Sequence, residues 1–244
     1  MTRSPPAARA GLDRVLAVNC GATPHLALAF LPARTVFANT LVIFPLHTDA
    51  AFCALQSRPH EIWARFFGSS MKDDLRYTPS DVFETFPFPR DWTTNPALEA
   101  AGQAYHHFRA DVMVKNSEGL TKTYNRFHDP NERDPAIVRL RDLHADMDRV
   151  VLASYGWTDI DTTTCEFLLD HEIDEEEWSP RRKKPWRYRW PDAVRNEVLA
   201  RLVALNEERA AGTGDTHDGN EPEVLDLGHS RDGCSRPQPR CVSR

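Results

Sequence analysis

The chain has 244 residues, 41% of them apolar, and a formal net charge of −6, which suits one large or two small domains. No run of about 18 apolar residues suggests a membrane span, and the Pro-, Ala- and Arg-rich residues 1–13 lack the apolar centre of a secretory signal. Five cysteines without a Cys-x-x-Cys pair fit a reducing compartment. We therefore expect a cytoplasmic protein with no membrane partner.

Residues 14–47 are predicted to be rich in β structure. Residues 14–18 form a short apolar strand, and residues 35–46, rich in Val, Ile and Phe, form a longer one. One helix is predicted after Asp49 and a second over residues 59–68, where a proline begins it and a glycine ends it. Because two or three strands make a poor sheet alone, we expect this α+β region to be incomplete.

A change of character follows in residues 69–89. Residues 69–76 are polar and mixed in charge, and Thr78 with Pro79 is typical of the start of a short helix. The Phe-Pro-Phe-Pro segment 86–89 cannot continue a helix or join a central strand, because each proline lacks an N–H donor and has a fixed φ. We predict an extended segment anchored by its two phenylalanines, at a seam between two structural units.

The second part is predicted to be a small helical bundle. Helices begin at Asn95-Pro96, at Asp134-Pro135 and at Asp192, and the second one ends at Gly156. Apolar residues recur in each at intervals of three or four, which predicts one buried face per helix; they are Leu98, Ala101, Tyr105, Phe108 and Val112, then Ile137, Leu140, His144, Met147, Val151 and Tyr155, then Val194, Val198, Leu202 and Leu205.

An acidic run at residues 171–178 is followed by a basic one at residues 181–189. Cations bind phosphates and release counterions, and arginine can also read guanine, so the basic run is the candidate for DNA contact, favouring phosphate positioning over base readout. A local basic segment can bind DNA on an acidic protein. The other hypothesis is a hairpin whose two runs neutralise each other. The candidate residues are Arg181, Arg182, Lys183, Lys184, Arg187 and Arg189, with Lys72 and Arg76 from the earlier stretch.

Several segments, in order, resemble the C-terminal part of type IIG restriction–modification enzymes, which fuse an adenine-specific DNA methyltransferase to a target recognition domain. They are residues 55–64, the Gly-Ser-Ser turn 68–70, the Tyr-Thr and Phe-Pro-Phe-Pro motifs within 77–89, and residues 120–125, 140–148, 155–157, 189–191 and 205–209. The resemblance implies binding to double-stranded DNA. It divides the chain into a disordered N-terminus (1–13), a partial target-recognition region (14–89), a helical region with a charged hairpin or loop (90–210) and a disordered tail (211–244).

The motifs of methyl transfer and DNA cleavage are missing from the sequence. It has no glycine-rich turn for S-adenosylmethionine, no Asn/Asp-Pro-Pro-aromatic loop for a flipped base, and no carboxylate pair followed by lysine for Mg²⁺. We therefore expect no catalysis by this chain alone, and S-adenosylmethionine only in a separate methyltransferase chain. The leading hypothesis is a DNA-binding target-recognition fragment. The alternatives are a protein-interaction module that docks onto a methyltransferase subunit, or the remnant of a split gene.

The histidines offer no metal-ligand spacing. We predict core or surface positions for His106, His107, His128 and His144. His144 and Asp148 are four residues apart on one predicted helix, which indicates a local pair. The sequence predicts no catalytic or metal-binding constellation.

Overall fold

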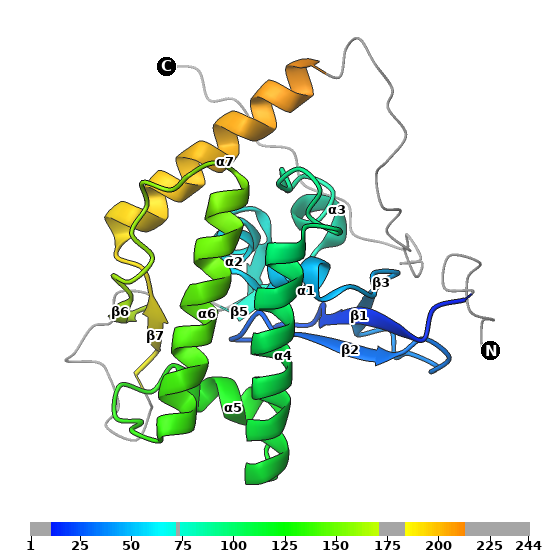
Figure 1. Cartoon of the computed structure of the whole chain (residues 1–244), viewed down its shortest axis with the longest axis vertical. Coiled ribbons are helices and arrows are strands. Elements are labelled where there is room, and N and C mark those ends of the chain that lie inside the picture. Colours follow the sequence, from blue (N-terminus) through cyan, green and yellow to red (C-terminus); the bar gives the residue numbers. More distant parts are fainter. Residues whose placement is uncertain (1–10, 72–73, 171–183, 213–244) are drawn as a thin grey trace, which may run out of the picture.

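The computed structural model describes residues 11–71, 74–170 and 184–212, and its small sheets and long helices confirm the predicted α+β class (Figure 1). In the described part, no helix is both long and apolar enough to span a membrane. Disorder was predicted for residues 1–13 and 211–244. Most of these residues, 1–10 and 213–244, lie outside the described residues. Residues 211–212 belong to the last helix.

An antiparallel sheet of three strands forms the first layer, with β1 in the centre. Its strands are β1 (Arg14–Asn19), β2 (Leu28–Pro32) and β3 (Leu41–Phe44). Leu16 pairs with Phe30 on one side and Phe44 on the other. The predicted strand at 35–46 is shortened to β3, since residues 33–40 turn back through hydrogen bonds from Thr35 N to Pro32 O and from Leu41 N to Ala38 O. The sequence reading missed β2.

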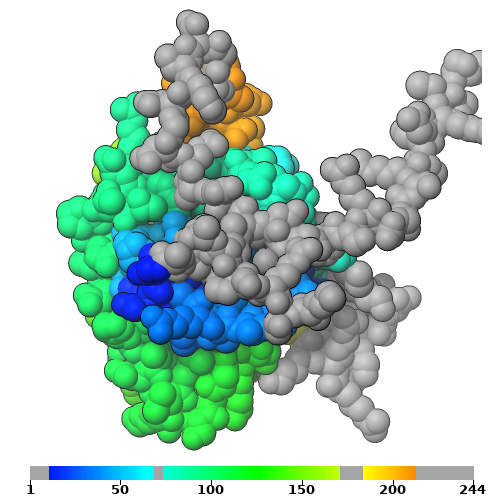
Figure 2. Space-filling view, turned by 90° about the vertical axis from the view of Figure 1, so that its right-hand side faces the viewer, coloured from blue at the N-terminus to red at the C-terminus, as the bar shows by residue number. Residues whose placement is uncertain are grey.

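Side chains alternate between the two faces of the sheet, as strand geometry requires. Leu16 and Val18 of β1 belong to the main core, whereas Val15 and Ala17 belong to a small second cluster with Ile43. Both faces of β1 are therefore buried. Figure 2 shows the first strands (blue) seated directly against the helical residues (green).

Helices α1 (Asp49–Gln56) and α2 (Arg58–Phe67) follow the sheet, close to their predicted positions. Thr48 caps α1 by accepting a hydrogen bond from Ala51 N at 3.2 Å. All residues of α1 are buried, because it lies between the sheet and a later helix. Gly68 ends α2, donating its N–H to Ala64 O at 2.9 Å.

The polar stretch after α2 pairs into a hairpin of β4 (Ser69–Met71) and β5 (Asp74–Arg76). The short helix α3 (Pro79–Val82) begins at Pro79, after Thr78, as predicted. Phe86 and Phe88 lie in neither helix nor strand. Phe86 is buried with its ring 4.9 Å from that of His60, and Phe88 stacks on Trp92 at 4.0 Å. The predicted role of both phenylalanines as anchors is confirmed.

Four helices complete the fold: α4 (Pro96–Asn116), α5 (Leu120–Phe127), α6 (Pro135–Ser154) and α7 (Asp192–Gly212). The caps act as predicted, since Asn95 accepts from Ala97 N and Asp134 accepts from Ala136 N, both at 2.9 Å. In Figure 1, α4 and α6 run side by side, α5 crosses their lower end and α7 slants across the top. The sequence reading did not identify α5 as a helix.

One hydrophobic core passes through the seam predicted near residue 89. It contains sheet and α1 residues together with residues of α4, α6 and α7. At the same seam, the buried Arg109 of α4 donates to Leu28 O at 2.7 Å and to the Tyr124 hydroxyl at 2.9 Å. Residues 14–89 and the helices that follow them are therefore packed into a single body.

Candidate nucleic-acid interface

The described part of the basic run forms strand β7 (Trp186–Arg189), which pairs with β6 (Glu166–Leu169). Arg189 lies opposite Glu166, and Trp186 lies opposite Leu169. The connection between the two strands, residues 171–183, lies outside the described residues. It contains the acidic run and the candidates Arg181, Arg182 and Lys183, and Lys72 also lies outside.

The structure brings together the basic run and the earlier mixed-charge stretch that contains Arg76. Leu75 of β5 exchanges two backbone hydrogen bonds with Thr23, at 2.9 and 3.0 Å. The neighbouring carbonyl of Pro24 accepts a bond from Arg187 of β7 at 2.7 Å and one from Arg65 of α2 at 2.9 Å. Both hairpins and α2 thus meet at the loop of residues 23–25. We call this meeting point the junction.

A cluster of four charges holds the junction together. Arg65 is 2.9 Å from Glu61 and 3.6 Å from Asp170, and Arg187 is 2.9 Å from Asp170 and 3.6 Å from Glu61. Burial alone would raise the pKa of Glu61 and of Asp170, but the two arginines outweigh it, so each pKa is below its ordinary value. Both carboxylates are therefore ionised at neutral pH, and the cluster is electrically balanced.

Arg187 belongs to this cluster and not to the surface. It is 6% exposed, too little for its guanidinium to contact a phosphate of a duplex in this arrangement. Its acidic partners, Glu61 and Asp170, lie outside the run 171–178 that the neutralised-hairpin hypothesis named. We assign Arg187 to the packing of β7 against α2.

The other described candidates are closer to the solvent. Arg76, at the end of β5, and Lys184, just before β7, are exposed. Arg189 is partly buried and is 2.7 Å from Asp192 at the start of α7. Arg76 and Lys184 are therefore the described candidates best placed for phosphate contact.

Behind the junction lies a buried ion pair between α2 and α6. The backbone N–H of Arg58 donates to Asp148 at 2.8 Å, and the Arg58 guanidinium bonds the same carboxylate. His144 is 3.4 Å from Asp148, which confirms the predicted local pair. Burial would raise the pKa of Asp148, but Arg58 and His144 hold it below its ordinary value. The sequence reading missed Arg58, the strongest partner in the group.

Two histidines line the inner side of the junction. His25 bonds the Asn125 side chain at 2.8 Å, His128 accepts a bond from Tyr188 N at 3.0 Å, and the two rings stack with centroids 5.1 Å apart. Burial lowers the pKa of His25 to about 4, and burial also lowers the pKa of His128. Both are neutral at pH 7. Among the described residues, no group of His, Cys, Asp or Glu is arranged to hold a metal ion.

Comparison with known proteins agrees with the predicted resemblance. Residues 14–90 match a family model described as MmeI, target recognition domain. The structure of the Type IIL restriction-modification enzyme MmeI in complex with DNA shares the fold, with a TM-score of 0.55 and 17% identity over 85% of the present chain. The chain covers 22% of that enzyme chain. No curated protein matches it. The resemblance to the target-recognition region of restriction–modification enzymes is thus confirmed, and residues 14–90 are the part that carries it.

Proposed function

We propose that this chain is a DNA-binding target-recognition fragment of a site-specific, adenine-specific DNA methyltransferase of the restriction–modification kind, acting in the cytoplasm. The match of residues 14–90 to the MmeI target recognition domain carries the proposal. The MmeI structure of the same fold was determined in complex with DNA, which supports double-stranded DNA as the partner.

The junction is the proposed contact surface. Arg76 of the β4–β5 hairpin and Lys184 beside β7 are exposed, and their strands are tied to the same 23–25 loop by Leu75 and Arg187. Lysine and arginine on a rigid support suit phosphate contacts, which set register on a duplex without reading its sequence. Lys72, Arg181, Arg182 and Lys183 complete the proposed set.

The junction is also preorganised for binding. The four-charge cluster fixes α2 against β7, and the neutral histidine pair fixes the 23–25 loop against α5 and β7. A surface that is ordered before binding loses less conformational entropy on association. The structure thus supports a rigid platform for the exposed cations.

The chemistry of methyl transfer is proposed for a separate chain. The present chain spans 22% of the MmeI chain, and its sequence lacks the glycine-rich turn and the Asn/Asp-Pro-Pro-aromatic loop of a methyltransferase. We propose that S-adenosylmethionine and the catalytic residues reside on a methyltransferase chain that works with this one.

A second candidate is a protein-interaction module that docks onto the methyltransferase chain. The observation in its favour is that Arg187 and Arg189 are both ion-paired within the chain. On that hypothesis the remaining cations are a solvated surface, and their removal leaves partner binding unchanged.

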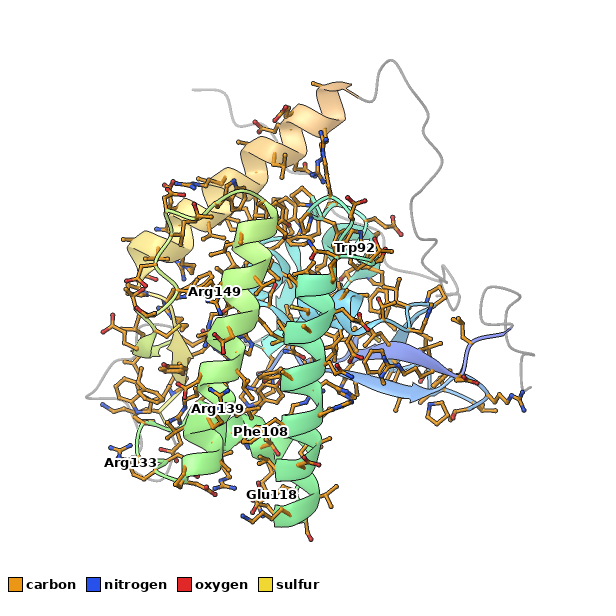
Figure 3. All side chains as sticks on the ribbon, in the orientation of Figure 1. Trp92, Phe108, Glu118, Arg133, Arg139 and Arg149 are labelled. Atoms are coloured by element: carbon orange, nitrogen blue, oxygen red, sulfur yellow. The ribbon has the colours of Figure 1, made fainter. Side chains whose placement is uncertain are left out.

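The salt dependence of duplex binding separates the two functions. The logarithm of affinity falls with the logarithm of salt concentration by about 0.9 for each phosphate contact. Replacing Arg76 and Lys184 with glutamine should lower that slope by about 1.8 if each contacts one phosphate. Arg139 and Arg149, exposed on α6 and labelled in Figure 3, give a matched control in which two glutamines should leave the slope unchanged. No duplex affinity in the presence of the methyltransferase chain would refute the proposed function.

A further inference from the structure

A cavity of about 230 Å³ lies between α2 and the first turns of α7, next to the junction. Its size suits a small molecule and is too small for a helix. Apolar side chains form one wall, namely Ile62, Phe66 and Leu199, with the buried Trp190 beside them. Phe66 is 61% exposed, so an aromatic face is available at the edge of the cavity.

Arginines from both helices and from β7 also line the cavity. Arg189 and Arg195 line the cavity and share one carboxylate, Asp192, at 2.7 and 3.4 Å. The four-charge cluster beside them is balanced, as is the Arg58–Asp148 pair. Among the described residues, the cavity wall therefore carries an excess of one positive charge, which favours an anionic ligand.

Several buried N–H groups of this wall lack an acceptor. Within the described residues, Nε and Nη1 of Arg187, Nε of Arg189 and Nη2 of Arg58 have no hydrogen-bond partner. All three residues line the cavity, and Arg58 and Arg187 are more than nine-tenths buried. These nitrogen atoms are buried behind the cavity surface and do not face it. Buried cationic N–H groups without an acceptor are costly, so an anion in the adjacent cavity would stabilise all three guanidinium groups. Phosphate oxygens accept several charge-assisted bonds at once.

We propose that this cavity binds one nucleotide, with its phosphate on Arg189 and Arg195 and its base against Phe66 and Leu199. The choice of ligand rests on the proposed function, because the cavity itself requires only a planar apolar group that bears an anion. The nucleotide is either free or part of a DNA strand, and both sources present the same chemistry.

Calorimetric titration of the full chain with adenosine 5′-monophosphate tests the proposal, with inorganic phosphate as the comparison ligand. We expect saturable binding of the nucleotide and at least about tenfold weaker binding of phosphate, which corresponds to about 1.4 kcal/mol. Arg195→Gln, at a partly exposed position, should weaken nucleotide binding about tenfold. Leu199→Phe should abolish it by filling the cavity.

Arg201→Gln is the matched control, because Arg201 lies on the same helix and pairs outside the cavity with Asp159 and Glu197. It should bind the nucleotide like the native chain. Circular dichroism shows whether each variant is folded. Absence of nucleotide binding at millimolar concentration, or binding that Arg195→Gln leaves unchanged, would overturn the proposal, as would phosphate binding equal to that of the nucleotide.

Competition with a single-stranded oligonucleotide identifies the source. Displacement of the bound nucleotide supports a nucleotide within a DNA strand, and persistence supports a free nucleotide.

The proposed function and the cavity proposal can be refuted independently of each other. If Arg195→Gln weakens nucleotide binding while the native chain has no affinity for duplex DNA even with the methyltransferase chain present, the proposed function is wrong and the cavity binds a free nucleotide. If duplex binding follows the predicted salt slope and the cavity binds no nucleotide, only the cavity proposal is wrong.

Discussion

The molecule is held together by two contacts of opposite chemistry. Between α1 and α4 the packing is tight and largely apolar, and the backbone of Asp49 approaches Gly102 so closely that an added Cβ would lie 2.8 Å from the Asp49 carbonyl carbon and 3.0 Å from Cys53 Cβ. At the junction, α2 meets β7 and the 23–25 loop through charges and histidines. The stability that the α1–α4 contact provides should therefore depend on side-chain volume, and the stability that the junction provides should depend on charge and pH.

The largest expected effect is on the apolar contact. Gly102→Val places side-chain atoms against the backbone of Asp49, which cannot move without shifting all of α1. We expect a loss of about 4 kcal/mol in the free energy of unfolding, beyond the usual range for overpacking. Urea unfolding measures it, with Gln103→Ala, an exposed neighbour on α4, as the control that should change little. A loss below about 1 kcal/mol would show that α1 and α4 are not rigidly packed.

The next largest loss of stability is expected at the junction. Arg187→Met removes one cation from the four-charge cluster and leaves Glu61 and Asp170 with Arg65 alone. Removing one partner of a buried ion pair costs about 3 kcal/mol or more, whereas replacing both partners with apolar residues costs much less. We expect the double variant with Asp170→Leu to recover part of the stability. If the double variant loses as much stability as the two single variants added together, Arg187 and Asp170 are not coupled and the expectation is wrong.

A smaller effect should appear in how the stability of the fold depends on pH. Burial lowers the pKa of His25 and of His60 to about 4, from an ordinary value of 6.5. Between these two values the unfolded chain binds protons that the folded chain does not, so stability is complete above pH 6.5 and falls as the pH drops toward 4. At pH 5.5 each histidine should cost about 1 kcal/mol. Urea midpoints at pH 7.5 and 5.5 measure this, and a pH-independent midpoint would contradict it.

The two contacts also differ in how far the sequence predicts them. The apolar faces of α4 and α6 follow from local spacing, and the caps at Asn95 and Asp134 are local signals as well. The partners of Arg187 are not local, since the carbonyl of Pro24 that it binds lies 163 residues earlier. The sequence shows that a residue is charged, but it does not show which distant group that residue contacts. For this reason a predicted surface cation is found inside the junction.

Two elements were missed for a related reason. Strand β2 ends at Pro32, and a proline reads as a loop signal unless the pairing strand is known. Helix α5 has eight residues and lacks a side-chain cap, and it is held by contacts such as Arg141 Nε to Phe127 O at 2.9 Å. Both depend on tertiary partners. The family resemblance was predicted from motifs such as the Gly-Ser-Ser turn 68–70 and the Phe-Pro-Phe-Pro segment 86–89, and the family model spans residues 14–90.

Selection from a pool of duplexes with a randomised segment tests target recognition most directly. The full chain, together with the methyltransferase chain proposed as its partner, is used to capture bound duplexes, which are then sequenced. We expect enrichment of one short motif. Replacing Arg76 and Lys184 should lower the capture of all duplexes while the enriched motif stays the same, and replacing Arg139 and Arg149 should change neither. A bound pool with the same composition as the input would contradict target recognition.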